Sequence, residues 1–162
     1  MRSTLTSTLV VALLTLAGAA SAATTSGART SLVPPFVQHL IAKRSPLLAY
    51  VPTRIAAPSF RYAGFQASPT KVSVTLAQTP RRKIVFSAIP YSAPCADGKQ
   101  RSFQLSGNKV YWAQLDNTQT AWRCVMGPGG RQVRLAASST LALNQYAPEG
   151  LGTIVASALR VR

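Results

Sequence analysis

Acidic residues are scarce in this chain, with three Asp and Glu against 18 Lys and Arg among 162 residues. Asp97 in ADGK and Asp116 in LDNT have the surroundings of turn residues. Glu149 falls in the first turn of an expected helix, where the helix dipole favours a carboxylate. Catalysis by paired carboxylates needs two acids brought together, and each of these three has a structural role instead. The composition therefore disfavours paired-carboxylate chemistry.

Histidine occurs once, as His39, beside the apolar stripe of an expected helix. A Ser-His-Asp or Cys-His arrangement would need this residue, but a lone helical histidine is more typical of a partly buried surface position. One histidine, two cysteines and three dispersed acids do not supply the convergent ligands of a metal site. The GPGG stretch at 127–130 lacks the helix and the Lys-Ser/Thr pair of a phosphate-binding loop. We expect no enzymatic activity, no catalytic residues, no metal and no cofactor.

Cysteine occurs only twice, as Cys95 and Cys124. In an exported chain two cysteines most simply form one disulfide, and the spacing of a redox-active pair is absent. Chain-entropy reasoning gives such a bridge a stabilising effect of roughly 3–4 kcal/mol. The sequence predicts a Cys95–Cys124 disulfide.

The apolar run at 9–17 is too short for a convincing membrane span. It follows Arg2 and precedes an A-x-A sequence at 20–22, which together are typical of a secretory signal peptide. We expect residues 1–22 to be cleaved and the protein to be secreted or extracytoplasmic, with an uncleaved anchor as the alternative. No cysteine follows the apolar run, which disfavours a lipid-anchored lipoprotein.

The formal net charge of +15 favours anionic partners through long-range attraction that weakens with salt. For an exported protein these partners are anionic envelope polymers or lipid head groups, with nucleic acid less favoured. The competing interpretation is a basic surface that only keeps the protein soluble. Oligomeric state is not indicated by the sequence.

The pattern predicts a single α+β domain. PPFVQHLIAKR at 34–44 has prolines at its start, an apolar stripe, and basic residues at its end, which is typical of a helix. From residue 60 the apolar period changes to two, and short turns then imply antiparallel neighbours. The expected strands are 61–67, 71–78, 84–89, 102–106, 109–114, 120–126 and 131–138, with two-residue turns at 107–108 and 116–117.

A closing helix is expected after Pro148, with an apolar face formed by Leu151, Ile154, Val155, Ala158 and Leu159. The prediction is one antiparallel sheet of six to seven strands, with the N-terminal and C-terminal helices packed on one face. Residues 23–47 are expected to form a flexible leader and the first helix, and 48–162 the sheet domain.

Strict alternation assigns faces to the expected strands. If Cys124 points to the core, Trp122 and Met126 follow it, and Val133, Leu135 and Ala137 match them on the next strand. The opposite, exposed face would then carry basic and aromatic groups able to bind polyanions, in competition with a merely solvated face. The candidate anion-binding residues on this face, its strand ends and its basic tip are Arg123, Arg134, Tyr111, Lys109, Arg101, Arg81, Arg82 and Lys83.

The sequence therefore favours an exported, non-enzymatic module that engages anionic cell-envelope material through a basic sheet face. The alternative is a carrier or sensor that holds an apolar, lipid-like ligand between sheet and helices. That alternative needs a cavity, for which we expect Val74, Phe86, Trp112 and Val155 as lining residues.

The order FQLSGNKVYW, TAWRCVM, VRLAASS and LGTIVASALR resembles a small extracytoplasmic bacterial domain of unassigned function, which occurs in lipoproteins and anti-sigma-factor-like membrane proteins. The resemblance covers about residues 48–159, from a proline-containing lead through a Gly-Asn hairpin and a Trp-bearing strand to a closing helix. It implies no catalytic residues. The expected disulfide, the strong basicity and the absence of a lipid-attachment cysteine depart from that pattern. The architecture is also similar to curved-sheet carriers of acyl chains, at the level of fold alone.

Overall fold

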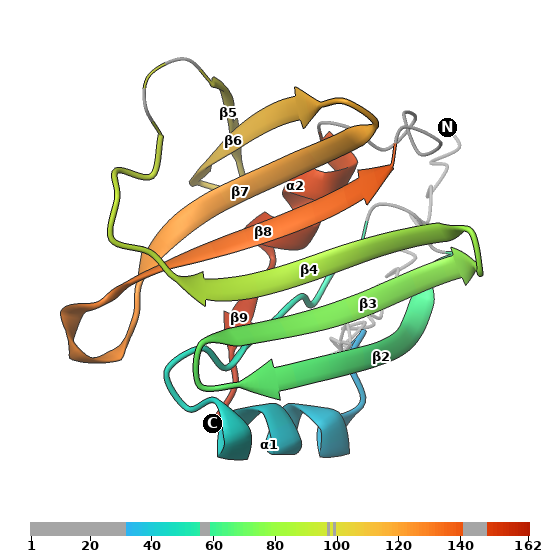
Figure 1. Cartoon of the computed structure of the whole chain (residues 1–162), viewed down its shortest axis with the longest axis vertical. Helices are drawn as coiled ribbons and strands as arrows, with labels where there is room; N and C mark the ends of the chain where they lie inside the picture. The colour runs from blue at the N-terminus through green and yellow to red at the C-terminus, as the bar shows by residue number, and fades with distance from the viewer. Residues whose placement is uncertain (1–31, 56–58, 97, 99, 141–148) are drawn as a thin grey trace, which may run out of the picture.

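The computed structural model describes residues 32–55, 59–96, 98, 100–140 and 149–162 (Figure 1). The expected signal peptide, most of the leader, the side chain of Glu149 and all of Asp97 lie outside the described part. No helix in the described ranges is long and apolar enough to cross a membrane.

Seven antiparallel strands form the main sheet, in the order β2-β3-β4-β8-β7-β6-β5 (Figure 1). Two meanders, β2 to β4 and β5 to β8, join where β4 pairs with β8. A long connection therefore runs from β4 to β5 at the far edge. The strands are β2 (Arg61–Ser68), β3 (Lys71–Thr79), β4 (Arg82–Pro90), β5 (Arg101–Leu105), β6 (Asn108–Leu115), β7 (Thr118–Met126) and β8 (Gln132–Thr140). The predicted α+β class with a mostly antiparallel sheet is confirmed.

Alternating apolar residues place the core on one face of this sheet, here called the inner face. Its central strands carry Val72, Val74 and Leu76 on β3 and Ile84 and Phe86 on β4, all of them buried. The register continues this row onto β8, where Phe86 lies opposite Ala137. Burial of each large apolar side chain contributes about 1.5–3 kcal/mol, so this face holds the sheet in register.

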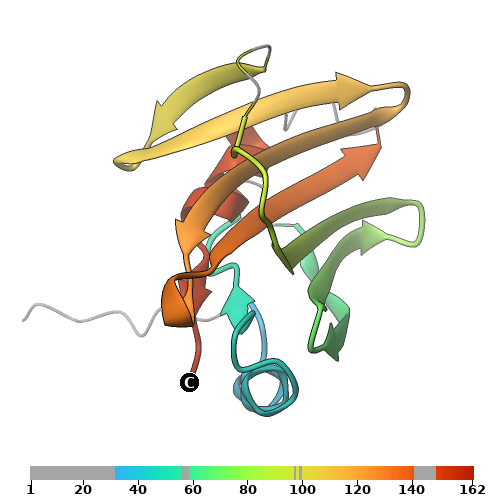
Figure 2. The same ribbon diagram turned by 60° about the vertical axis from the view of Figure 1, so that its left-hand side comes forward.

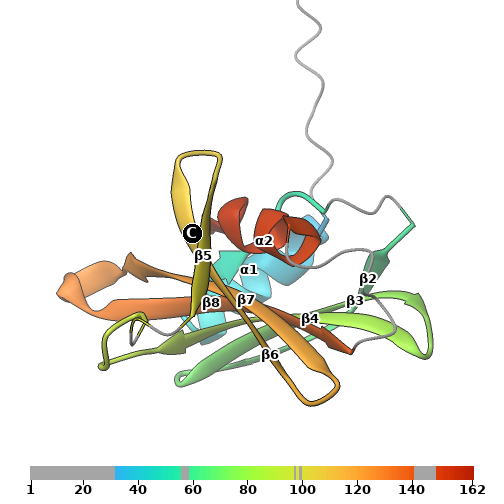
Figure 3. The same cartoon turned by 90° about the horizontal axis from the view of Figure 1, so that it is seen from above.

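Two helices accompany the sheet, and both begin close to the predicted positions, although the second ends before the predicted Leu159. In α1 (Pro35–Arg44), the predicted apolar stripe comprises Phe36, Val37, Leu40 and Ile41. Val37 and Ile41 are fully buried, Leu40 is half-buried and Phe36 is exposed. Helix α2 (Glu149–Ala156) buries Leu151, Ile154 and Val155. It packs against β5, β6, β7 and β8, while α1 contacts β2 (Figure 3).

A second, two-stranded sheet pairs β1 (Tyr50–Val51) with β9 (Leu159–Arg160). The sequence did not indicate this sheet, because two-residue strands carry no periodicity. Leu159, expected on the apolar face of the last helix, is 56 % exposed in β9. That assignment was wrong because α2 ends at Ala156.

The hairpin turns follow the predicted positions with one shift. Asp116 has the positive φ expected at the β6–β7 turn. In the β5–β6 turn the residues with positive φ are Ser106 and Gly107, so the expected Gly107-Asn108 pair is displaced by one residue. Asn108 is instead the first residue of β6, where its amide donates to the carbonyl of Ser106 at 3.1 Å.

Candidate anion-binding face

The register of β7 and β8 decides which side chains share a face. Arg123 lies opposite Leu135, and Cys124 lies opposite Arg134. Directly paired residues point to the same side, so Arg123 belongs to the inner face with the core, while Arg134 belongs to the outer face. The predicted pairing of Arg123 and Arg134 on one exposed face is wrong, as is the placement of Trp122, Cys124 and Met126 toward the core.

Arg123 caps the end of α2 on the inner face. Its Nε donates to the carbonyl of Val155 at 3.1 Å, and its Nη2 donates to the carbonyl of Ala158 at 3.2 Å. Its Nη1 donates to Oδ1 of Asn108. Burial lowers the pKa of Arg123 from its ordinary value. A cation at these C-terminal carbonyls satisfies groups that the helix leaves without partners, so Arg123 has a structural role.

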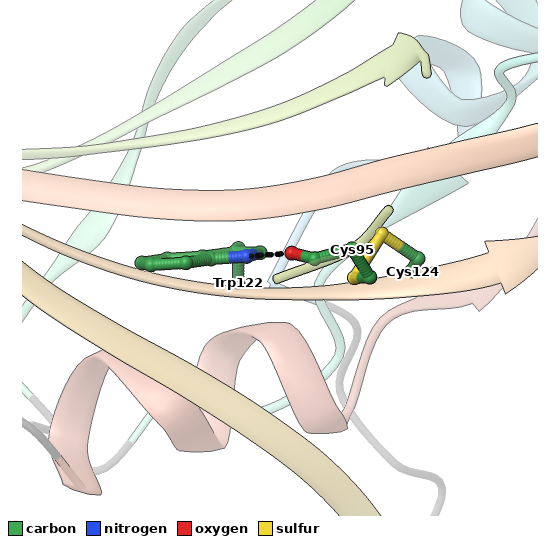
Figure 4. Close-up of a disulfide and its surroundings, with 3 residues drawn as sticks. All are labelled: Cys95, Trp122 and Cys124. Carbon is green, nitrogen blue, oxygen red and sulfur yellow. Dashed lines mark hydrogen bonds between the residues drawn. A yellow bond between two sulfur atoms is a disulfide. The ribbon is translucent and has the colours of Figure 1, made fainter. Parts of the chain in front are cut away.

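The predicted disulfide is present and ties down the connection between β4 and β5. Cys95 and Cys124 are joined with their Cα atoms 5.8 Å apart. Beside the bridge, Nε1 of Trp122 donates to the carbonyl of Cys95 at 2.8 Å (Figure 4). We call residues 91–96 the strap. Figure 2 shows the connection passing across β8 and β7, and the buried state of Trp122, only 4 % exposed on the outer face, agrees with this cover.

Cations and aromatic rings stack on one another where the strap meets the outer face. The guanidinium carbon of Arg134 lies 5.3 Å from the ring centre of Tyr91 and 4.7 Å from that of Trp122. Trp122 stacks on Tyr111 at 5.9 Å, and Nζ of Lys109 lies 5.4 Å from the Tyr111 ring. The Nε of Arg134 is buried without a hydrogen-bond partner among the described residues. Each cation–ring contact contributes about 0.5–2 kcal/mol, so this stack holds the strap and is partly withdrawn from solvent.

The remaining predicted cations are exposed but scattered. Arg101 on edge strand β5 lies opposite Trp112 on the inner side, 5.7 Å from its ring centre. Arg81 and Arg82 form the tip of the β3–β4 hairpin, where Arg82 Nη1 donates to Oε1 of Gln78 at 3.4 Å. Lys83 pairs with Ala77 and points to the outer face. The structure therefore does not gather the eight candidate residues into one site.

An open trough lies on the outer face of β2, β3 and β4, beyond the strap. Its volume is about 490 Å³. Two exposed lysines, Lys71 and Lys83, contribute to its lining. Ser73 and Thr75 lie between them on β3. The other lining residues are Ala63, Gly64, Phe65, Gln66 and Val85.

Lys71, Gln66, Ser73 and Thr75 were missed as site residues. The signal was present in KVSVTLAQ, where Lys71, Ser73 and Thr75 share the phase opposite to Val72, Val74 and Leu76. That phase was interpreted only as the solvated side of a strand. Nothing in the sequence showed that β2 and β4 flank it and complete a trough.

The trough carries positive charge without a compensating carboxylate among its lining residues. Of the three acidic residues, Asp116 is the one whose side chain the structure describes, and it is exposed at the β6–β7 turn. An anion that enters the trough near Lys71 or near Lys83 therefore meets an ammonium group and no carboxylate from the described lining.

The hollows found in the described part do not offer the expected apolar cavity. Val74, Phe86 and Val155 are fully buried in the packed core. One enclosed apolar hollow, near Leu48, Pro69, Pro128 and Val133, has a volume of about 150 Å³, whereas pockets for drug-sized ligands are about 300–1,000 Å³. The described residues also contain no group of three or more His, Cys, Asp and Glu that could hold a metal.

No protein-family model, curated protein or solved structure matches this chain.

Proposed function

We propose that this protein is an exported, non-enzymatic binding module that engages anionic cell-envelope material through the outer face of its sheet. The observation that carries the proposal is the trough over β2, β3 and β4, which has Lys71 and Lys83 in its lining and no carboxylate among its lining residues. Of these two lysines, Lys83 was among the candidates first expected and Lys71 was not, and the proposed class of partner is the same.

The placement of the helices supports an open outer face. Contacts of α2 with β5 to β8, and of α1 with β2, are consistent with both helices covering the inner face. In Figure 3 both helices lie above the sheet, and the underside carries neither helix. A sheet closed on one side by helices leaves the other side free for a partner.

The proposed role is binding alone, and electrostatic attraction to the lysines supplies it. Each lysine that approaches an anion contributes modestly, about 0.2–1 kcal/mol at an exposed position. The attraction is strengthened by the surrounding excess of Lys and Arg, and it releases counterions when the partner is a polyanion. We therefore expect binding of moderate affinity that falls steeply with salt. The disulfide fits an oxidising, extracytoplasmic location.

The test is co-sedimentation of oxidised residues 23–162 with envelope fragments from the host. Salt is raised from about 0.01 M to about 1 M, over which the Debye length falls from about 30 Å to about 3 Å. The double variant Lys71→Gln with Lys83→Gln is compared with Lys43→Gln with Arg44→Gln, which removes two exposed charges from α1. We expect the trough variant alone to reduce affinity, by about three- to tenfold. Salt-independent binding, or equal losses in both variants, would contradict the proposal.

A further inference from the structure

The two lysines of the trough are well separated along the strands. Lys71 is the first residue of β3, and Lys83 lies opposite Ala77, six residues further along the same strand. At about 3.4 Å per residue, their backbones are about 20 Å apart along β3. A small anion cannot bridge that distance, so a ligand that uses both lysines has to be extended.

The floor of the trough between the lysines mixes polar and apolar groups. Half-buried Thr75 supplies a hydroxyl group and exposed Gln66 supplies an amide that can both donate and accept, whereas Ser73 between the strands is only 8 % exposed. Gly64 presents open space, with no heavy atom within 4 Å of where a Cβ would stand. An extended chain with many hydroxyl groups can therefore approach the backbone here and exchange hydrogen bonds along its length.

The same lining disfavours other anionic partners. Phe65, the one aromatic residue that lines the trough, is packed against the core, so no ring lies open for nucleobases to stack on. Val85 is 39 % exposed, and one such side chain is too little for an acyl chain to bury against. Charge at the ends and hydroxyls between them match a sugar chain better than a lipid surface.

We infer that the trough is a subsite for an acidic glycan, which lies along β3 with anionic substituents at Lys71 and Lys83. A pyranose advances an extended chain by about one and a half strand residues, so about four sugars span the two lysines. This inference rests on the proposed function and deepens it, because it names the class of polymer and its direction on the sheet.

The test is a length series of oligogalacturonates, measured by calorimetry at low salt with the oxidised protein. Affinity should rise with chain length until both lysines are reached, at about four to five sugars, and then level off. In Lys83→Gln the rise should stop at shorter chains, whereas Lys43→Gln on α1 should leave the length profile unchanged. Methyl-esterified oligomers, which keep the hydroxyls and lack the charges, should bind far more weakly.

A second variant separates hydroxyl recognition from charge. Thr75→Val keeps the shape and strand propensity of the side chain and removes its hydroxyl, so it should weaken oligogalacturonate binding about two- to tenfold. The same variant should leave binding of polyphosphate, a sugar-free polyanion, unchanged.

The outcomes distinguish this inference from the proposed function. If polyphosphate or anionic vesicles bind as tightly as oligogalacturonates, with no break in the length series, the glycan subsite is overturned while the anion-binding module stands. If no polyanion binds in a salt-dependent manner, both are overturned.

Discussion

Arg123 and Arg134 come from neighbouring strands and differ in what surrounds their guanidinium groups. Arg123 donates to two carbonyls at the end of α2 and to Asn108, whereas Arg134 lies between two rings and its buried Nε has no partner among the described residues. Hydrogen bonds to charged groups are worth about 1.5–3 kcal/mol each, and a buried carbonyl left without a donor is costly. The two arginines should therefore respond differently to truncation.

Replacing Arg123→Met should lower the free energy of unfolding by about 2–4 kcal/mol, because the carbonyls of Val155 and Ala158 lose their donor. Urea denaturation measures the change. The matched control is Arg101→Met, which removes an exposed arginine that rests on a ring and should cost less than about 1 kcal/mol. Similar losses in the two variants would show that Arg123 does not stabilise α2.

At the scale of elements, the sequence was enough to locate the strands. It was not enough to decide which residues of β7 point toward the core. Alternation is clear in β3, β4 and β8 because the fully buried large apolar side chains all lie on their inner faces, although β4 also carries Val85 and Ile89 on its outer face. In β7 both faces are partly apolar, since Ala121 and Val125 face inward and Trp122 lies outward beneath the strap. The cover over Trp122 comes from Cys95, 27 residues away, and a local pattern cannot reveal it.

A local sequence pattern is equally unable to reveal the trough or the two-stranded sheet formed by β1 and β9. The trough depends on which strands flank β3, and the small sheet depends on contacts such as Thr53 Oγ1 donating to the carbonyl of Ser157 at 2.7 Å. The disulfide was predictable because two cysteines in an exported chain leave one simple pairing. The sequence places no comparable restriction on which other distant segments pair with each other.

The strap should depend on its disulfide. Replacing both Cys95 and Cys124 by Ala should cost roughly 3–4 kcal/mol of stability, since the unfolded chain loses a constraint over a separation of 29 residues. Trp122 should become more exposed, because its acceptor on Cys95 is no longer held in place. Tryptophan fluorescence should shift to longer wavelength and quench more readily with acrylamide. Unchanged fluorescence in a folded variant would show that packing alone holds the strap.

A side chain at Gly152 should weaken the packing of α2 on β5. A Cβ there would meet Cζ of Phe103 at 2.7 Å, so glycine allows the helix to approach β5. Gly152→Ala gains about 1 kcal/mol in helix propensity. It should nevertheless lower the free energy of unfolding by about 1–2 kcal/mol, because overpacking costs up to about 3 kcal/mol.

The control for this contact is the double variant with Phe103→Leu, which shortens the facing side chain. Calorimetric unfolding should show that Phe103→Leu costs less stability in the Gly152→Ala background than in the wild type. Additive losses would mean that the two side chains do not meet.

At the scale of the whole molecule, the excess of positive charge destabilises the folded chain and strengthens its binding to polyanions. Eighteen Lys and Arg against three acids repel one another more strongly when the chain is compact. Salt screens this repulsion, so the free energy of unfolding should rise between about 0.01 M and 0.1 M NaCl, where the Debye length falls from about 30 Å to about 10 Å. Affinity for a polyanion should fall over the same range, because each counterion released into a more concentrated salt solution gains less entropy.

Both responses should weaken when the trough is neutralised. In the Lys71→Gln, Lys83→Gln variant, the plot of log affinity for oligogalacturonate against log salt should lose about 0.7 in slope for each contact removed, by analogy with single-stranded nucleic acids. Urea denaturation of the same variant should show a smaller gain in stability with salt, since two repelling charges are gone. A variant with lower affinity and an unchanged slope would mean that the two lysines shape the trough without contacting anions. An unchanged slope would thus direct the search for the anionic contacts to Lys109 and to the hairpin tip at Arg81 and Arg82.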